Sequence, residues 1–256
     1  MSAAAQVLHQ FRYDQRIFWR NPASVFFTVI FPVILLLLFA GLFGDQTIDA
    51  LGVDAETYYV PGIITLAVVS ATLVSLAMNL VVAREAGRLK RVRSTPLPAW
   101  AFIASRIGNS VVIALLMVVL VTGLGAILFG VEVPTRTAPA MLVSLLVGAF
   151  AFCSLGFALS AVIPSEDAAP AITNAAVLPL YFISGVFVPE TEIPDGVLKI
   201  ADLFPIRHFF EALFAAFDPA TTGAGFEWGQ LAFVALWGVA GGLIALRWFR
   251  WSPAGD

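Results

Sequence analysis

Residues 33–39 read Val33-Ile34-Leu35-Leu36-Leu37-Leu38-Phe39, which is a solid apolar run. The run lies inside the longer segment 23–44, which has no Asp, Glu, Lys or Arg. A helix needs about 20 apolar residues to cross the hydrocarbon core of a bilayer. A membrane β-barrel would instead use segments of about ten alternating residues, and the apolar part of a signal peptide spans only about 7–15 residues. The segment therefore predicts a membrane-spanning helix.

The rest of the 256-residue chain extends this pattern. Hydrophobic residues make up 60% of it and charged residues 12%, with a mean hydropathy of +0.92. A soluble domain has about 45–50% apolar and about 25% charged residues, so that class is excluded. We predict an all-α polytopic membrane protein that forms a single domain over residues 1–256. Its six spans are expected at 23–44, 58–82, 102–129, 139–163, 169–188 and 229–247.

The basic residues are distributed unevenly between the predicted loops. Eleven of the 14 lysines and arginines lie before the first span, between the second and third spans or at the start of the third, or at the end of the sixth and after it. With six spans, these three segments lie on one side of the membrane, and the intervening loops carry mostly acidic residues. Because cytoplasmic loops are enriched in Lys and Arg, both termini are predicted to be cytoplasmic.

Residues 1–22 have an amphipathic pattern. One face of a helix in this segment would carry Val7, Leu8, Phe11 and Phe18, and another His9, Arg12, Arg16 and Arg20. Such a helix typically lies in the membrane interface. It would serve either as a simple anchor next to the membrane or as a docking surface in the cytosol.

The predicted outer loop, 189–228, contains a second helical stripe. Its apolar residues recur at helical spacing and are Ile206, Phe209, Phe210, Leu213, Phe214 and Phe217. This pattern predicts a helix that lies at the outer interface or re-enters the membrane before the last span. His208 and Glu211 lie elsewhere on it, either as part of a solvated polar face or as a proton-relay pair.

The cytoplasmic loop 83–101 carries the most specific pattern. It contains the order Glu85-Ala86-Gly87-Arg88-Leu89-Lys90-Arg91-Val92-Arg93-Ser94-Thr95-Pro96-Leu97. A short helix is expected to end near Ser94, because Pro96 disfavours a helical conformation of Thr95. Contact with anionic lipid would explain the basic residues but not the order of Glu, Gly and Thr-Pro-Leu.

This order resembles a motif of ABC transporter permeases of the type-2 exporter family, in particular its drug-resistance and lipid-export branch, which includes daunorubicin exporters. Members carry an E-x-G motif followed by T-P-L after the second span. The resemblance continues at Ser184-Gly185 through Pro189 and at Phe204-Pro205-Ile206. Phe204 departs from the family, which often has Asn before this proline.

The resemblance implies a permease that exports a hydrophobic or amphipathic substrate (a drug, lipid or glycolipid) across a bacterial inner membrane. It also implies two ATP-binding subunits and a second permease chain as partners, with the loop after the second span acting as a coupling helix in a groove of the ATPase. The residues that it assigns to this contact are Arg84, Glu85, Gly87, Arg88, Leu89, Lys90, Arg91, Arg93, Thr95, Pro96 and Leu97. Basic side chains there would pair with acidic groups of the partner.

The chain is not expected to be an enzyme in its own right. A nucleotide-binding P-loop requires Gly-x-x-x-x-Gly-Lys followed by Ser or Thr, and neither Lys90 nor Lys199 has that context. ATP and Mg would therefore be bound by the partner subunit, and no cofactor is expected on this chain. The sequence has no Cys/His cluster that would suggest a metal site, and a net charge of -3 argues against nucleic-acid binding.

Polar residues recur in the second and fifth predicted spans. They are Thr72, Ser75, Asn79, Asn174, Tyr181 and Ser184. They would form hydrogen bonds between helices, or they would line a substrate pathway or a dimer interface, which is where the family places these two spans. The alternatives to a permease are a self-contained channel or secondary transporter, which would need charges inside the membrane, and an intramembrane enzyme, which would need a catalytic constellation.

Overall fold

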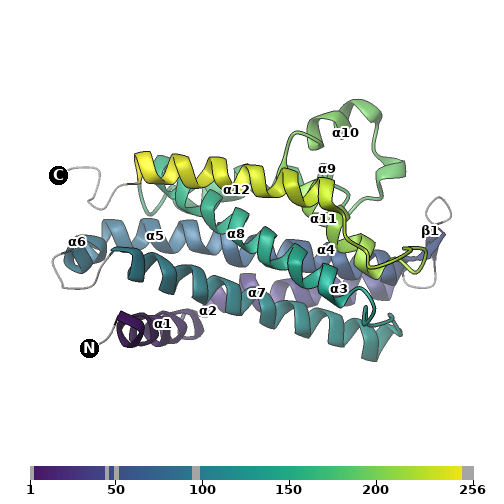
Figure 1. The fold of residues 1–256 in the computed structure, drawn as a ribbon, viewed down its shortest axis with the longest axis horizontal. Helices are drawn as coiled ribbons and strands as arrows, with labels where there is room; N and C mark the ends of the chain where they lie inside the picture. The colour runs from purple at the N-terminus through teal and green to yellow at the C-terminus, as the bar shows by residue number, and fades with distance from the viewer. Residues whose placement is uncertain (1–2, 44–45, 49–51, 94–98, 250–256) are drawn as a thin grey trace.

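A computed structural model describes residues 3–43, 46–48, 52–93 and 99–249. Long helices run side by side and form an elongated bundle (Figure 1). One end of the bundle carries α6 (Arg88–Arg93), α1 (Ala3–Trp19) and the last turns of α12 (Trp228–Trp248). The other end carries a small hairpin of β1 (Thr47–Ile48) and β2 (Val53–Asp54). These ends are called the α6 end and the β1 end below.

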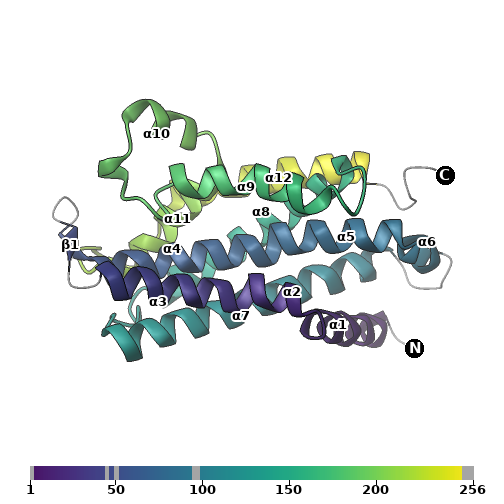
Figure 2. The ribbon, with the colours of Figure 1, turned by 180° about the vertical axis from the view of Figure 1, so that it is seen from behind.

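Among the described residues, five helical stretches are long and apolar enough to cross a membrane. They are Pro22–Phe43, Ala55–Glu85, Trp100–Phe129, Ala138–Val162 and Trp228–Trp248. The first stretch comprises α2 (Pro22–Val25), the π-helical η1 (Phe26–Ile30) and α3 (Phe31–Phe43). The second comprises α4 (Ala55–Val69), the π-helical η2 (Ser70–Val74) and α5 (Ser75–Glu85). The third and fourth correspond to α7 (Ala99–Phe129) and α8 (Ala138–Val162). Figure 2 shows α2 and α3 passing along the rest of the bundle.

The helix in the predicted fifth span is shorter than the sequence suggested. α9 (Ala169–Ile183) has 15 residues and ends before residue 188. Gly185 follows with a φ of +81°, a backbone conformation that glycine adopts without steric cost. The chain then continues without a helix, and the Gly185 carbonyl accepts a hydrogen bond from Tyr58 near the start of α4. The helix and this extension together run along α4 and α5.

The segment between α9 and α12 folds into three helical pieces. They are η3 (Glu190–Glu192), α10 (Asp195–Ala201) and α11 (Pro205–Phe217). Both views show α10 standing off from the bundle at the side (Figures 1 and 2). The stripe predicted for this loop falls on α11, where Ile206, Phe209 and Leu213 are buried. Because α11 packs against α4, α8 and α12, this face of the helix lies inside the bundle.

Glycines allow close packing of α8 with its neighbours. A Cβ at Gly148 would lie 2.2 Å from the Phe209 ring of α11, so only glycine leaves room for that ring. On α12, a Cβ at Gly238 would lie 2.8 Å from the Ala151 backbone, and one at Gly241 would lie 3.0 Å from Leu155. Close backbone approach is the usual role of small residues between membrane helices. α8 and α12 therefore pack as one tightly joined pair.

The face that α1 turns to the bundle agrees only in part with the predicted apolar face. Phe18 is buried where α1 packs on α7, as predicted, whereas Leu8 is exposed and the acidic Asp14 is buried. Arg12 and Arg16 are exposed, as the sequence pattern predicts. The difference arises because α7 offers Asp14 a polar environment, which a pattern of apolar spacing does not reveal.

Candidate functional site

The predicted coupling segment forms a sharp turn at the α6 end of the bundle. α5 ends at Glu85, and Gly87 adopts a φ of +66° while its N–H bonds the Arg84 carbonyl at 2.9 Å. This left-handed residue closes α5 and lets α6 begin at once with Arg88. Only Ala86 and Gly87 therefore separate the second spanning stretch from the short basic helix.

A buried leucine holds α6 to the bundle. Leu89 is fully buried in an apolar cluster that also contains Leu80, Phe102, Cys153 and Phe157. These neighbours come from α5, α7 and α8. Since a helix of six residues is not stable by itself in water, the burial of Leu89 helps to hold α6 in place.

Arg84 and Glu85 make their contacts within this subunit. The Arg84 side chain is 4% exposed and forms an ion pair with Glu85, with 3.0 Å between Nε and Oε1. Its two terminal nitrogens donate to the backbone carbonyls of Ser160 at 2.9 Å and Ile163 at 2.6 Å. These carbonyls belong to the last turn of α8 and to the residue after it. Arg84 therefore connects the end of α5 to the end of α8.

The other predicted coupling residues are described to different extents. Arg88 is half-buried and Lys90 is exposed at the surface of α6. The backbones of Arg91 and Arg93 continue the helix. The remaining three residues, Thr95, Pro96 and Leu97, lie outside the described part of the chain. The contact of this segment with an ATP-binding subunit stays a prediction.

A second ionic contact at this end was missed in the sequence. The Asp14 carboxylate on α1 lies 3.5 Å from a terminal nitrogen of Arg106 on α7, and it accepts hydrogen bonds from Gln10 at 3.0 Å and Ser105 at 3.4 Å. Burial raises the pKa of Asp14 above its usual range, although Arg106 and these two hydrogen bonds lower it in part. A lone acid in a basic helix was the available signal, but nothing in the sequence shows what it faces.

The polar residues of the second spanning stretch mostly bond their own helix. Thr72 is fully buried, and its hydroxyl donates to the Val68 carbonyl at 2.6 Å. Asn79 donates to the Ser75 carbonyl at 2.7 Å and to its hydroxyl at 3.2 Å. Ser75 and Asn79 are half-buried, so this pair reaches the surface of the subunit and Thr72 does not.

The polar residues in and after α9 are divided in the same way. Tyr181 is buried, and its hydroxyl lies 3.3 Å from the Leu66 carbonyl and 3.4 Å from the Ser70 hydroxyl. Ser184 is also buried, and its hydroxyl has no hydrogen-bond partner among the described residues. Asn174 is exposed. The structure therefore brings Tyr181 to the second spanning stretch and leaves Asn174 on the outside.

The β1 end has an ionic cluster centred on Arg207 of α11. Its guanidinium lies 2.8 Å from carboxylate oxygens of Glu190, Asp202 and Glu211. Gln230 on α12 connects Glu211 to His208, donating to Glu211 at 2.5 Å and contacting the imidazole with its oxygen. Burial raises the pKa of Glu211, although Arg207 lowers it in part. The cluster ties the segment between α9 and α11 to the bundle.

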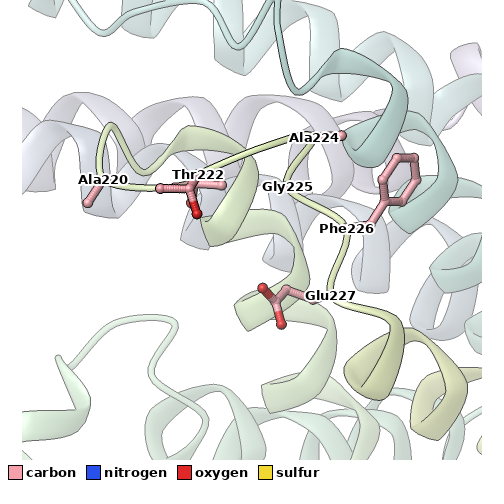
Figure 3. Close-up of a pocket in the computed structure, with 7 residues that line it drawn as sticks. Ala220, Thr222, Ala224, Gly225, Phe226 and Glu227 are labelled. Carbon is pink, nitrogen blue, oxygen red and sulfur yellow. The ribbon is translucent and has the colours of Figure 1, made fainter.

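A hollow of about 460 Å³ lies in the loop before α12 (Figure 3). It is lined by Ala220, Thr221, Thr222, Ala224, Gly225, Phe226 and Glu227. Figure 3 shows small side chains along most of this loop, with the Phe226 ring and the Glu227 carboxylate on its last part. The hollow contains none of the predicted site residues.

Comparison with known proteins shows the family of this chain. The pattern of the ABC-2 type transporter family matches residues 5–217. YvfS of Bacillus subtilis (strain 168), named as a transport permease, is 24% identical over 74% of this chain and 76% of its own length. The inner membrane transport permease YadH of Escherichia coli (strain K12) is 24% identical over 70% of this chain and 71% of its own. A relative named ycf38 from Pyropia yezoensis, also named as a transport permease, is 28% identical over 75% of this chain and 67% of its own. The chain belongs to the ABC-2 type transporter family, as a membrane permease component.

Proposed function

We propose that this chain is the permease subunit of an ABC exporter of a bacterial inner membrane, driven by ATP hydrolysis on two separate ATP-binding subunits. The observation that carries the proposal is the anchored α6 helix. Its Lys90 is exposed and its Arg88 half-buried, and its Leu89 belongs to an apolar cluster with residues of α5, α7 and α8. A partner that moves α6 would therefore move the ends of three spanning helices with it.

Charge supports a cytoplasmic location for the α6 end. This end collects α1 with its exposed Arg12 and Arg16, α6 itself, and Arg247 in the last turn of α12. Positive residues favour the cytoplasmic side. The relative named as an inner membrane transport permease supports the same membrane.

The path of α9 supports six crossings rather than five. α9 starts beside Val81 near the α6 end, where Ala169 is buried against it. Its Tyr181 reaches Leu66, and the following Gly185 reaches Tyr58 near the β1 end. The helix and its non-helical extension thus follow the second spanning stretch over most of its length. The backbone after Ile183 is tolerated at membrane depth because it is buried in protein.

The exposed side of α9 is where we place the second permease chain. Leu178 and Phe182 are exposed there, together with Asn174. Helix α9 packs on α5, on which Ser75 and Asn79 reach the surface. An amphipathic cargo, such as a drug, lipid or glycolipid, would find apolar side chains and a few hydrogen-bonding groups between two such faces.

A self-contained channel or secondary transporter is the alternative, and the position of the buried charges argues against it. Within the described residues, Asp14, Arg84 and Arg106 are buried or nearly so at the α6 end, and Arg207, with 12% of its side chain exposed, lies in the ionic cluster of the β1 end. Ion-coupled carriers use ionisable groups near the middle of the membrane.

The test is reconstitution with and without the ATP-binding subunits. The tagged chain would be purified in mild detergent with the subunits that accompany it, placed in proteoliposomes, and supplied with a fluorescent amphipathic dye. We expect ATP-dependent dye movement with the complex and none with the chain alone. Uphill movement by the chain alone would contradict the proposal, as would a purified chain that binds no ATP-hydrolysing subunit.

A further inference from the structure

Arg84 caps the end of a helix other than its own. The last carbonyls of an α-helix lack partners within that helix, and a cation near them is favoured by the helix dipole. Ser160 and Ile163 contribute two such carbonyls at the end of α8, and both accept from the Arg84 guanidinium. The third donor is satisfied by Glu85.

The geometry leaves Arg84 directed inward. With its side chain 4% exposed and its Nε and two terminal nitrogens engaged within the subunit, the guanidinium has little surface for an acidic group on a partner. Removing a buried charged donor leaves carbonyls without partners, which costs free energy. A planar fork that bonds two carbonyls also fixes the orientation of the helices that it joins.

We propose that Arg84 is a positioning residue that fastens the coupling segment to α8, so that α8 and the α12 packed on it move together with α6 during the ATP cycle. This inference rests on the proposed function, since it requires a partner that moves α6. Two features make the connection: Arg84 bonds the end of α8, and Leu89 belongs to the apolar cluster that includes Cys153 and Phe157 of the same helix. Only three residues, Glu85 to Gly87, separate Arg84 from α6.

The tight packing of α12 extends this unit. Gly238 and Gly241 bring the backbone of α12 against α8, and packed interfaces of this kind move as rigid bodies rather than deform. Without Arg84, α6 would still pull α5 through the peptide chain, whereas α8 would follow only through the apolar cluster. ATP binding by the partner would then move α5 without moving α8 and α12 to the same extent, and transport would be reduced.

The test measures the distance between α5 and α8 in the reconstituted complex with its ATP-binding subunits. Spin labels would be attached to cysteines at Val82, which is half-buried, and Val162, which is 67% exposed. The distance is measured by pulsed electron paramagnetic resonance without nucleotide and after trapping with ATP and vanadate. In the native background we expect the same distance in both states. In Arg84→Met we expect the distance to differ between the states, with ATP hydrolysis retained and dye transport reduced at least tenfold.

Arg136→Met is the matched control. Arg136 also donates to a backbone carbonyl, that of Thr221, but it lies at the β1 end. We expect unchanged distances and transport in this variant. Native-like distances and transport in Arg84→Met would overturn the proposal, and so would equal effects of the two substitutions.

Two further results keep the proposal testable if Arg84→Met does not assemble. A distance in the native background that changes between the two states would overturn it without any variant at position 84. Arg84→Lys keeps the charge but loses the planar fork, so we expect partial transport and a broadened distance; full transport with an unchanged distance would contradict the positioning role. If instead the proposed function is wrong, the ATP-binding subunits will not purify with the native chain, and this result distinguishes that failure from a failure of the positioning role.

Discussion

Replacing Leu89 with alanine tests whether this one side chain holds α6 in place. The substitution removes three carbon atoms from a fully buried site. At about 0.8 kcal/mol for each buried carbon, the transfer cost is about 2.4 kcal/mol, and a remaining cavity raises it within the range of about 2–5 kcal/mol. Because about 1.4 kcal/mol corresponds to a factor of ten, the amides of α6 should exchange with solvent about 50-fold faster or more.

The assay is hydrogen exchange with mass spectrometry on the chain in lipid nanodiscs, following a peptide that covers α6. Leu246→Ala is the matched control, because Leu246 is 85% exposed near the same end of the bundle. We expect no change in α6 exchange in the control. If Leu89→Ala leaves α6 exchange as in the native chain, or if both variants accelerate it equally, the apolar cluster does not hold the helix and the argument fails.

Asp14→Asn is expected to remove a pH dependence of stability, because it replaces a buried carboxyl group by a neutral group of the same shape. The raised pKa of Asp14 means that the folded chain binds this proton more tightly than the unfolded chain. The stability of the native protein relative to Asp14→Asn should therefore increase as the pH falls from neutral through the window between the pKa of Asp14 in the folded chain and its pKa in the unfolded chain. Thermal unfolding of both proteins over a pH series measures this, and a decrease would refute it. Gly148→Ala is expected to lower the unfolding temperature, because its Cβ would collide with the Phe209 ring at a cost of about 1–3 kcal/mol. Gly123→Ala, with nothing near its Cβ, should leave that temperature unchanged or higher, and equal behaviour of the two variants would contradict the packing described here.

The general architecture follows from local features of the sequence. Apolar runs of sufficient length predict spanning helices, and five of the six expected segments contain helices that meet this description. The sixth, α9, contains an apolar helix but ends at Ile183, because Gly185 turns the chain and the following residues pack without helical hydrogen bonds. A prediction from composition does not detect such a break, because Val186 and Phe187 continue the apolar run beyond the end of the helix.

The contacts of the candidate site were less predictable. The basic segment around Arg84 predicts a side chain that faces a partner, yet this side chain bonds carbonyls 76 and 79 residues away. Asp14 likewise bonds residues far away in the sequence, Ser105 and Arg106 on α7. A sequence pattern describes which residues share a face, but the polar groups that meet that face come from distant segments, and only the packing of the helices brings them together.

The π-helical turns in the first two spanning stretches affect how their sequences align with those of relatives. These turns comprise Phe26–Ile30 and Ser70–Val74. Each accommodates one residue more than a regular helical turn. In a regular α-helix of the same sequence, the residues after the turn would point about 100° away from their present direction. Deleting one residue there converts the turn to regular geometry and leaves both halves facing the same neighbours. Single-residue gaps between homologous chains should therefore gather at these two places, while the rest of each spanning stretch keeps its length.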